Sequence, residues 1–500
     1  MQDPNRTLLV SKWLSAHLKS GVKASSILAS IEKKLGFLVY APKEDAETGI
    51  MFEVINNRGK QLSELEKVKN YLIYCSVKLS ASTLRNSIDS DWSDILHNLN
   101  TAKKTSSSDE GAFLRYCVAV HFMLNKTDSQ HGYDELKKLI NIDLAVKNNN
   151  SKKETIIQIK EFVAFLKAAA LWYARLFGQQ HNNIDPRLST ILNQLRAQGQ
   201  QASIMPIFLA LVLRLKGEGE QLVTLLRLLE ILNFRVYMAR NMTSRNDTGQ
   251  GDLYFYASHY YHNDLLKYFM AEQNKLGKRQ AKTQEDAIEY YLVTFILWYA
   301  TEQRFEDSFI LENGSPDDFY NWRGLRYFLM NYEAKLQPNK TIPIDKILKS
   351  RKEGKSSDYL SIEHVWAKEN RNKEGENNRS VDKFEKRRLG NFVLIELRLN
   401  IQGGNDSLEL KLSRYLKGYD GQQPTDLAQV RRMGRDAKKT LSGFEGKIQK
   451  KNYFNNLYKE LNSLQEKRYV KFANERWSIK EFLGYRQLIN EAKRADANET

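Results

Sequence analysis

Cysteine and proline are both scarce in this 500-residue sequence, which contains two cysteines and eight prolines. Cys75 and Cys117 form no C-x-x-C pair, so neither a disulfide framework nor a zinc ribbon is available. A reducing cytoplasm is therefore the expected compartment. Because proline is rare and 41% of the residues are hydrophobic, the composition indicates packed helices rather than a disordered scaffold.

Long apolar runs are also lacking. The stretch "ASIMPIFLALVL" at 202–213 is too short to span a bilayer. The first residues, "MQDPNRTLLV", lack the basic region and the long apolar core that an export signal needs. The sequence therefore predicts no membrane span and no export signal.

Acidic residues are too few to balance the basic ones. The 60 Asp and Glu residues stand against 77 Lys and Arg, which leaves a formal charge of +17. This excess favours a polyanionic partner such as DNA or RNA over an acidic small molecule. The length exceeds what one hydrophobic core supports, so two or three domains are expected.

The sequence pattern changes along the chain and suggests three regions. The first, 1–80, places the basic loop "NNRGKQ" between two helical patterns, and Ser63 with Glu66 predicts a capping box at the second helix. The second, 81–340, reads almost wholly as helices. The third, 341–500, mixes strand-like and helical patterns and is richer in positive charge. We therefore predict a mainly α protein with a small α+β region at its C-terminal end.

One helix of the second region has a clear apolar face. Its apolar residues follow the three-and-four spacing of a buried stripe, and they are Leu222, Leu225, Leu226, Leu229 and Leu232. This pattern predicts architecture and carries no chemistry.

A basic helix is predicted in the third region. Arg431, Arg435 and Lys438 or Lys439 share one face of it, which is the arrangement needed to follow a phosphate backbone. A solvated helix face explains the same charges equally well.

Histidine is rare as well, with eight residues in the chain. One of them, His364, directly follows Glu363 at the end of the strand-like stretch "YLSIEHVW". A polar loop and a second apolar run from Asn391 follow, and a helix is expected to start near Asn400. Strand, loop, strand and helix would form a ββα unit that brings these four residues into one neighbourhood. By itself, a histidine beside a strand is more often a structural residue.

The same residues resemble a known nuclease domain. The block "IEHVW … RRLGNFVLIELRLN … K" is similar to the His-Me-finger (HNH) domain at the C-terminus of GmrSD-type restriction endonucleases, whose pattern runs I-E-H-I-x-P, L-G-N-L, N and a later lysine. The matching residues here are Glu363, His364, Leu389, Gly390, Asn391, Asn400 and Lys411. Ala367 stands where the family usually has proline, a difference that concerns the loop after the histidine rather than the chemistry.

A second block resembles another part of the same family. "MFEVINNRGKQLSELEKVKNYL" at 51–72 is similar to the end of the ParB/sulfiredoxin-like N-terminal domain. The family's upstream D-G-Q-Q-R motif is missing before this block, so we expect only the C-terminal end of that domain, in a fragment or in half of a split system. An N-terminal partner subunit would then complete a site for GTP or ATP. The residues expected to meet the nucleotide are Asn56, Arg58, Gly59 and Lys60.

The resemblance implies a metal-dependent DNA endonuclease of a bacterial anti-phage restriction system that acts on phage or modified DNA. His364 would be the general base, because the ordinary pKa of histidine suits proton removal near neutral pH. Glu363 and Asn400 would hold Mg²⁺ or Mn²⁺, and Asn391 would orient the imidazole. The basic residues expected to contact DNA phosphates are Lys386, Arg387, Arg388 and Lys411, together with Arg431 and Arg435 of the basic helix.

Two other functions remain open at this stage. One is a non-catalytic DNA-binding or regulatory subunit that retains the motif. The other is an RNA-cleaving toxin, since the same chemistry acts on RNA. A homo-oligomer is also compatible with the sequence.

Overall fold

The computed structural model describes residues 4–34, 62–178, 181–276, 281–340, 360–367, 379–418, 421, 423–444, 450–486 and 488. The chain is mainly helical, which confirms the predicted class. It divides into two compact units, Met1–Gln61 and Leu62–Thr500.

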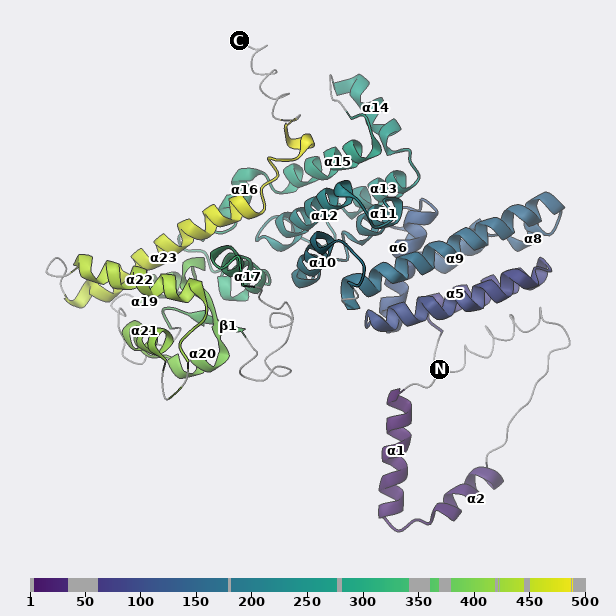
Figure 1. Ribbon diagram of the computed structural model, residues 1–500, viewed down its shortest axis with the longest axis horizontal. Helices are drawn as coiled ribbons and strands as arrows, with labels where there is room; N and C mark the ends of the chain where they lie inside the picture. Colours follow the sequence, from purple (N-terminus) through teal and green to yellow (C-terminus); the bar gives the residue numbers. More distant parts are fainter. Residues whose placement is uncertain are drawn as a thin grey trace. The chain divides into compact units, whose positions relative to one another are not determined.

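The described part of the first unit consists of two helices, α1 (Pro4–Lys19) and α2 (Ala24–Lys34) (Figure 1). α2 buries none of its residues, and Trp13 of α1 is 52% exposed. The predicted nucleotide-binding residues, Asn56, Arg58, Gly59 and Lys60, lie outside the described residues. The ParB-like domain end therefore stays a prediction.

The second unit begins with α4 (Glu64–Lys78), whose start confirms the predicted capping box. The Ser63 hydroxyl accepts from the Glu66 backbone N–H at 3.1 Å, and the Ser63 N–H donates to the Glu66 carboxylate at 2.8 Å. Leu65 and Val68 are fully buried, so α4 joins the hydrophobic core of this unit.

Helices continue through residue 336 and build most of the core (Figure 1). No helix in the described ranges combines the length and the apolar character needed to cross a membrane. The elements are α5 (Ser82–Thr101), α6 (Ser107–His121), η1 (Asp128–His131), α7 (Gly132–Leu139), α8 (Ile142–Ala145), α9 (Asn149–Gly178), α10 (Pro186–Gln198), α11 (Met205–Arg214), α12 (Glu220–Leu232), η2 (Asn233–Met238), α13 (Gln250–Tyr261), α14 (Leu265–Leu276), α15 (Gln284–Tyr299), α16 (Glu302–Asp307), η3 (Phe319–Asn321) and α17 (Leu325–Leu336).

α12 is the helix whose apolar face was predicted. All five leucines of that stripe are buried in the core, which confirms the prediction. The chain leaves α12 through η2, a π-helical turn of a kind that often marks a functional position.

The C-terminal part of the unit contains the two described strands. β1 (Leu360–His364) pairs antiparallel with β2 (Phe392–Glu396), and His364 lies opposite Phe392. A helix follows β2 directly, so the two predicted strands and the helix after them are present, with the helix starting three residues before Asn400. The predicted loop between the strands is corrected, because its described part contains the helix α19 and the 3₁₀ turn η4. The remaining elements are α19 (Arg379–Arg387), η4 (Leu389–Asn391), α20 (Leu397–Gly403), α21 (Leu408–Lys417), α22 (Ala428–Phe444) and α23 (Lys450–Arg476).

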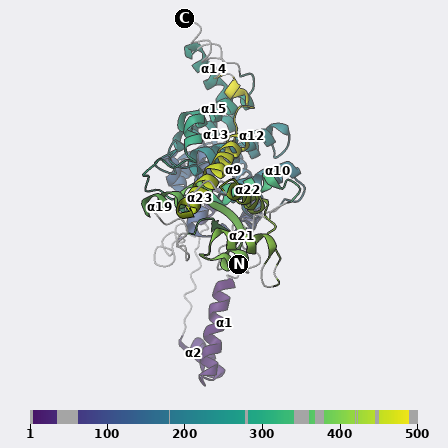
Figure 2. The same ribbon diagram turned by 90° about the vertical axis from the view of Figure 1, so that its left-hand side faces the viewer.

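α23 connects this C-terminal part to the helices before it. It lies beside α22 in both views (Figure 1, Figure 2), and the Trp477 ring just after it stacks on Phe234 of η2 with 3.7 Å between centroids. Arg476 donates to the buried Glu230 carboxylate of α12 at 3.0 Å. The regions predicted as 81–340 and 341–500 therefore share one continuous hydrophobic core.

Candidate functional site

His364 is the last residue of β1, and its side chain is half-buried. Its imidazole ring contacts Phe392 of β2, with 4.9 Å between centroids. It also contacts Tyr320 of η3, at 4.7 Å between centroids. Tyr320 itself is 49% exposed. The candidate general base thus lies against an aromatic residue of the helical part, on a face of the strand that reaches the surface.

Glu363 lies on the opposite face of β1, because successive side chains of a strand alternate. It is 3% exposed, and its carboxylate Oε1 accepts from the Lys411 ammonium group at 2.6 Å and from the Tyr415 hydroxyl at 3.0 Å. Burial raises the pKa of the Glu363 carboxyl, and the Lys411 charge opposes part of that shift. This face of the hairpin is closed by α21.

Lys411 is as buried as its partner, with 1% of its side chain exposed. It also donates to the backbone carbonyl of His364 at 2.8 Å. Gly403 allows this packing, since a Cβ there would lie 1.9 Å from the Tyr415 hydroxyl oxygen. The predicted phosphate contact of Lys411 does not fit this geometry, because its ammonium group points into the protein.

Asn391 is fully buried beneath the residues that follow His364. Its side-chain oxygen accepts from the Trp366 N–H at 2.7 Å, and its Nδ2 donates to the carbonyl oxygens of Trp366 and Lys386 at 3.1 and 2.8 Å. The prediction that its amide orients the imidazole is therefore corrected: both N–H groups and the oxygen of the amide bond to backbone groups of Trp366 and Lys386. Asn391 positions the segment that follows the histidine.

The neighbouring Gly390 has a packing reason of its own. A Cβ at this position would lie 2.2 Å from the Asn462 carbonyl oxygen of α23. The L-G-N turn is thus pressed against α23, which keeps Asn391 in place.

Asn400 is on α20 and is bonded to β1. Its Nδ2 donates to the Ser361 hydroxyl at 2.8 Å and to the Ile362 carbonyl at 3.0 Å. These contacts fasten the helix to the strand that ends in His364.

The predicted metal ligands were tested against these contacts. Glu363 already accepts from an ammonium group and a hydroxyl, and it faces away from His364. Among the residues that the structure describes, no three or more His, Cys, Asp or Glu side chains are grouped so as to hold a metal ion. Glu363 and Asn400, arranged in this way, do not fit Mg²⁺ or Mn²⁺ as a shared ligand pair.

Three of the predicted DNA contacts are on or next to α19. Arg388 is paired with two carboxylates, Glu385 at 3.0 Å and Glu466 at 2.5 Å. Arg387 donates to the Asp317 carbonyl at 3.2 Å. The Lys386 ammonium group lies 5.2 Å from the centre of the Trp366 ring. These cations hold α19 to its surroundings, so their contribution to DNA binding is limited by the contacts they already make.

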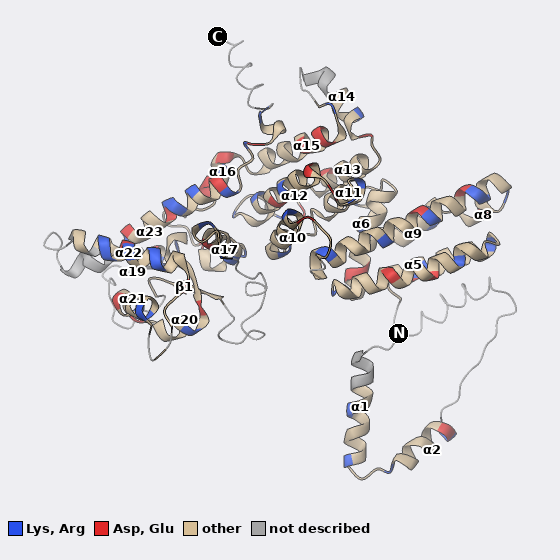
Figure 3. Ribbon diagram, viewed as in Figure 1, with Lys and Arg blue, Asp and Glu red and all other residues tan. Residues whose placement is uncertain are grey.

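α22 carries the basic face predicted from the sequence. Arg431, Arg435, Lys438 and Lys439 are exposed, and Lys and Arg recur along this helix (Figure 3). The guanidinium group of Arg431 also donates to the Thr425 carbonyl at 2.9 and 3.0 Å.

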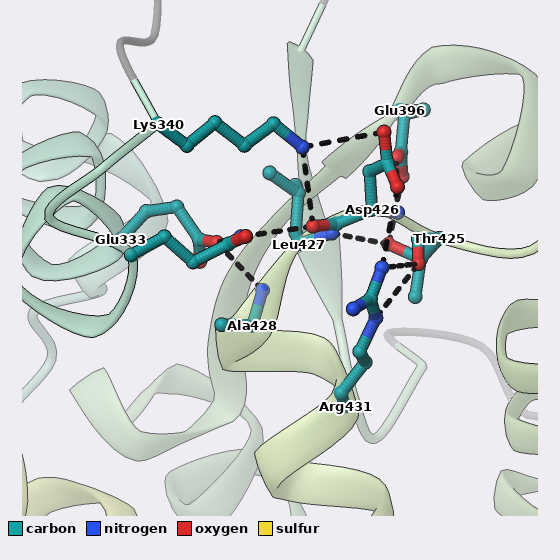
Figure 4. Close-up of polar contacts among 9 residues, drawn as sticks. Glu333, Lys340, Glu396, Thr425, Asp426, Leu427, Ala428 and Arg431 are labelled. Carbon is teal, nitrogen blue, oxygen red and sulfur yellow. Dashed lines mark hydrogen bonds and ion pairs between the residues drawn. The ribbon is translucent and has the colours of Figure 1, made fainter.

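Two carboxylates from different elements hold the start of α22 through hydrogen bonds (Figure 4). The Glu333 carboxylate of α17 accepts from the N–H groups of Ala428 and Gln429, at 2.6 and 3.0 Å. The Glu396 carboxylate at the end of β2 accepts from the Thr425 hydroxyl and the Asp426 N–H, both at 2.9 Å. A carboxylate at a helix N-terminus satisfies N–H groups that have no partner within the helix. The basic face is therefore held in a set position relative to β2.

Sequence reasoning missed Tyr320 and Tyr415, which contact His364 and Glu363. Neither is in a motif, and both are far from the strand in sequence. Spacing provides no signal for such contacts.

Comparison with protein-family models and with curated proteins found no match for this chain.

Proposed function

We propose that this chain is an endonuclease that cleaves DNA phosphodiester bonds at the β1–β2–α20 unit, with His364 as general base. The observation that carries the proposal is the position of His364. It ends β1 on a partly exposed face, while Asn391 holds the following backbone and Asn400 fastens α20 to the strand. The resemblance to the nuclease domain of GmrSD-type enzymes supports the same assignment.

The reaction needs a water molecule to lose a proton as its oxygen attacks the phosphorus. The His364 imidazole takes that proton, the bond from phosphorus to the 3′ oxygen breaks with its electron pair going to the oxygen, and the oxygen leaves as a hydroxyl after taking a proton from water. Exposed cations of α22, led by Arg435 and Lys438, would contact backbone phosphates without reading the sequence. No step is assigned to a metal ion, since the described residues do not fit one.

The resemblance also suggests the biological setting. It favours phage or modified DNA as substrate, in a bacterial restriction system. Adding Mg²⁺ or Mn²⁺, GTP or ATP, and an N-terminal partner subunit one at a time to the cleavage assay tests the cofactors and the partner that the resemblance implies.

A second candidate is a non-catalytic DNA-binding subunit. The contact that favours it is the closed Glu363–Lys411–Tyr415 cluster, because a buried ion pair occupies the acid that the nuclease pattern places beside the histidine. In that case the basic face of α22 would bind DNA, and His364 would have only a structural role.

The test is a cleavage assay with the purified chain on plasmid DNA, on phage DNA that carries modified bases and on total RNA. Each substrate is incubated with Mg²⁺, with Mn²⁺ or with a chelator. We expect DNA cleavage by the wild type and none by His364→Ala at equal melting temperature. Equal cleavage by both proteins contradicts the assignment, binding without cleavage favours the second candidate, and cleavage of RNA alone indicates a ribonuclease.

A further inference from the structure

A polar cavity of about 530 Å³ lies between the end of η2 and the segment that contains η3. It is lined by residues that flank Tyr320, including Asp318, Asn321 and Arg323. Tyr320 itself contacts the His364 ring. The wall of the cavity and the aromatic contact of the histidine therefore belong to one short segment.

The segment 317–322, which contains η3, is held in place by contacts at both of its ends. The Asp317 carboxylate pairs with Arg240 at 2.5 Å, and the Asp317 carbonyl accepts from Arg387 of α19 at 3.2 Å. The Asp318 carboxylate accepts from the Tyr320 N–H at 2.8 Å. Trp322 is fastened to the end of η2, since its indole N–H donates to the Met238 carbonyl at 2.6 Å. These contacts fix the positions of Asp317, Asp318 and Trp322 in the lining of the cavity.

Several polar groups on its lining have no partner within the described part of the chain. They are the side-chain amides of Gln200, Asn241, Asn246 and Asn321 and the guanidinium group of Arg323, which are open to solvent at the mouth of the cavity and so accessible to a ligand. An amide group both donates and accepts hydrogen bonds, as the edge of a nucleobase does. The formal charges of the lining cancel, because it contains two arginines and two aspartates. A neutral ligand with a donor and acceptor edge fits this lining better than an anion.

We propose that this cavity receives one unstacked nucleobase of the DNA strand that is cleaved at His364. The amides would bond to the edge of the base, and Arg323 would meet its flanking phosphate. The proposal rests on the proposed function, because only a nucleic-acid substrate at His364 brings a base to the cavity. It names a substrate subsite on the helical part of the unit that no motif in the sequence indicates.

The test uses the full chain with His364→Ala, so that DNA binding is measured without cleavage. A series of duplexes carries 2-aminopurine at one position each, because the fluorescence of this base rises when it leaves the stack. We expect binding to raise the fluorescence at one position of the series. Adding Asn241→Ala and Asn321→Ala removes the rise and weakens binding of a single strand of about 12 nucleotides roughly tenfold.

The matched control is Asn150→Ala, an exposed asparagine of α9 outside the cavity. It should leave both the fluorescence and the affinity unchanged, and all variants should melt at the same temperature. An unchanged fluorescence rise in the double variant overturns the proposal. A second outcome also overturns it: free nucleoside monophosphates bind in a way that depends on both asparagines, while DNA shows no fluorescence change. Neither readout uses cleavage, so failure of the endonuclease assignment would be seen separately, as equal cleavage by wild type and His364→Ala.

Discussion

Glu363 and His364 are neighbours in sequence, yet their side chains lie on opposite faces of β1 in contrasting surroundings. The Glu363 face is covered by α21, and its carboxylate is bonded to the buried groups of Lys411 and Tyr415. On the other face, the His364 ring is partly exposed and contacts Tyr320. Glu363 and His364, which the motif suggests as one catalytic pair, thus lie on different faces: Glu363 on the buried face and His364 on the accessible one. A motif identifies residue types, while the strand decides which of them can meet a substrate.

The largest expected effect comes from the accessible face. His364→Ala should lower the cleavage rate by about 10² to 10⁴-fold, which is the range that a general base contributes. The matched change on the closed face, Glu363→Leu with Lys411→Met, should leave the rate near that of the wild type. Single-turnover cleavage of labelled DNA measures both rates. Loss of cleavage in a folded double variant would show that Glu363 takes part in the reaction and that the two faces act together.

The closed face should instead determine stability. Lys411→Met leaves the Glu363 carboxylate buried without its cation, which typically costs about 3–5 kcal/mol in the free energy of unfolding. Replacing both partners, as in Glu363→Leu with Lys411→Met, should recover most of that loss because no buried charge remains. Urea unfolding of the single and double variants measures the difference. A single variant as stable as the wild type would mean that the pair is solvated.

The closed face should also make stability depend on pH. Because burial raises the pKa of Glu363, the folded protein keeps this proton at pH values where the unfolded chain has released it. Stability from this group is therefore present below the ordinary carboxyl pKa of about 4.3 and declines as the pH rises through the window up to the raised value.

We expect Glu363→Gln to flatten that decline in a urea titration from about pH 4 to about pH 8. The control is Glu409→Gln, an exposed carboxylate of α21, which should keep the wild-type pH dependence. A decline that persists in Glu363→Gln would assign it to another group.

The smallest effect concerns the basic face of α22, which both candidate functions use. Arg435→Ala with Lys438→Ala should flatten the slope of log affinity against log salt by roughly two units, at about 0.9 for each lost phosphate contact. Adding Arg431→Ala should change it less, since that guanidinium group is already bonded to Thr425.

Lys137→Ala with Lys138→Ala, on the exposed side of α7, is the charge-matched control. Fluorescence anisotropy of labelled duplex DNA at several salt concentrations gives the slopes. Equal slopes for wild type and the α22 variant would restore the interpretation of α22 as a solvated helix face.

Local sequence patterns predicted several elements correctly. The leucine stripe of α12 and the capping box at Ser63 follow from interactions between residues close in the chain. The strands β1 and β2 were also recognised from local patterns, although their pairing joins residues far apart in the sequence. The alternation that separates Glu363 from His364 is also a local rule. Grouping the two as one site overlooked that rule.

The exposed basic side of α22 and the strand that ends in His364 were determined by the sequence itself, because helix and strand periodicity depend on neighbouring residues. Tertiary structure alone decided that Lys411 neutralises Glu363 from 48 residues away, that Tyr320 lies on His364, and that Glu333 begins α22. The Lys411 and Glu333 contacts pair polar groups that burial would otherwise leave without a partner, and the Tyr320 contact covers part of the His364 ring. Which distant residue does so depends on how the helices pack around one core, and that packing is not contained in any local spacing.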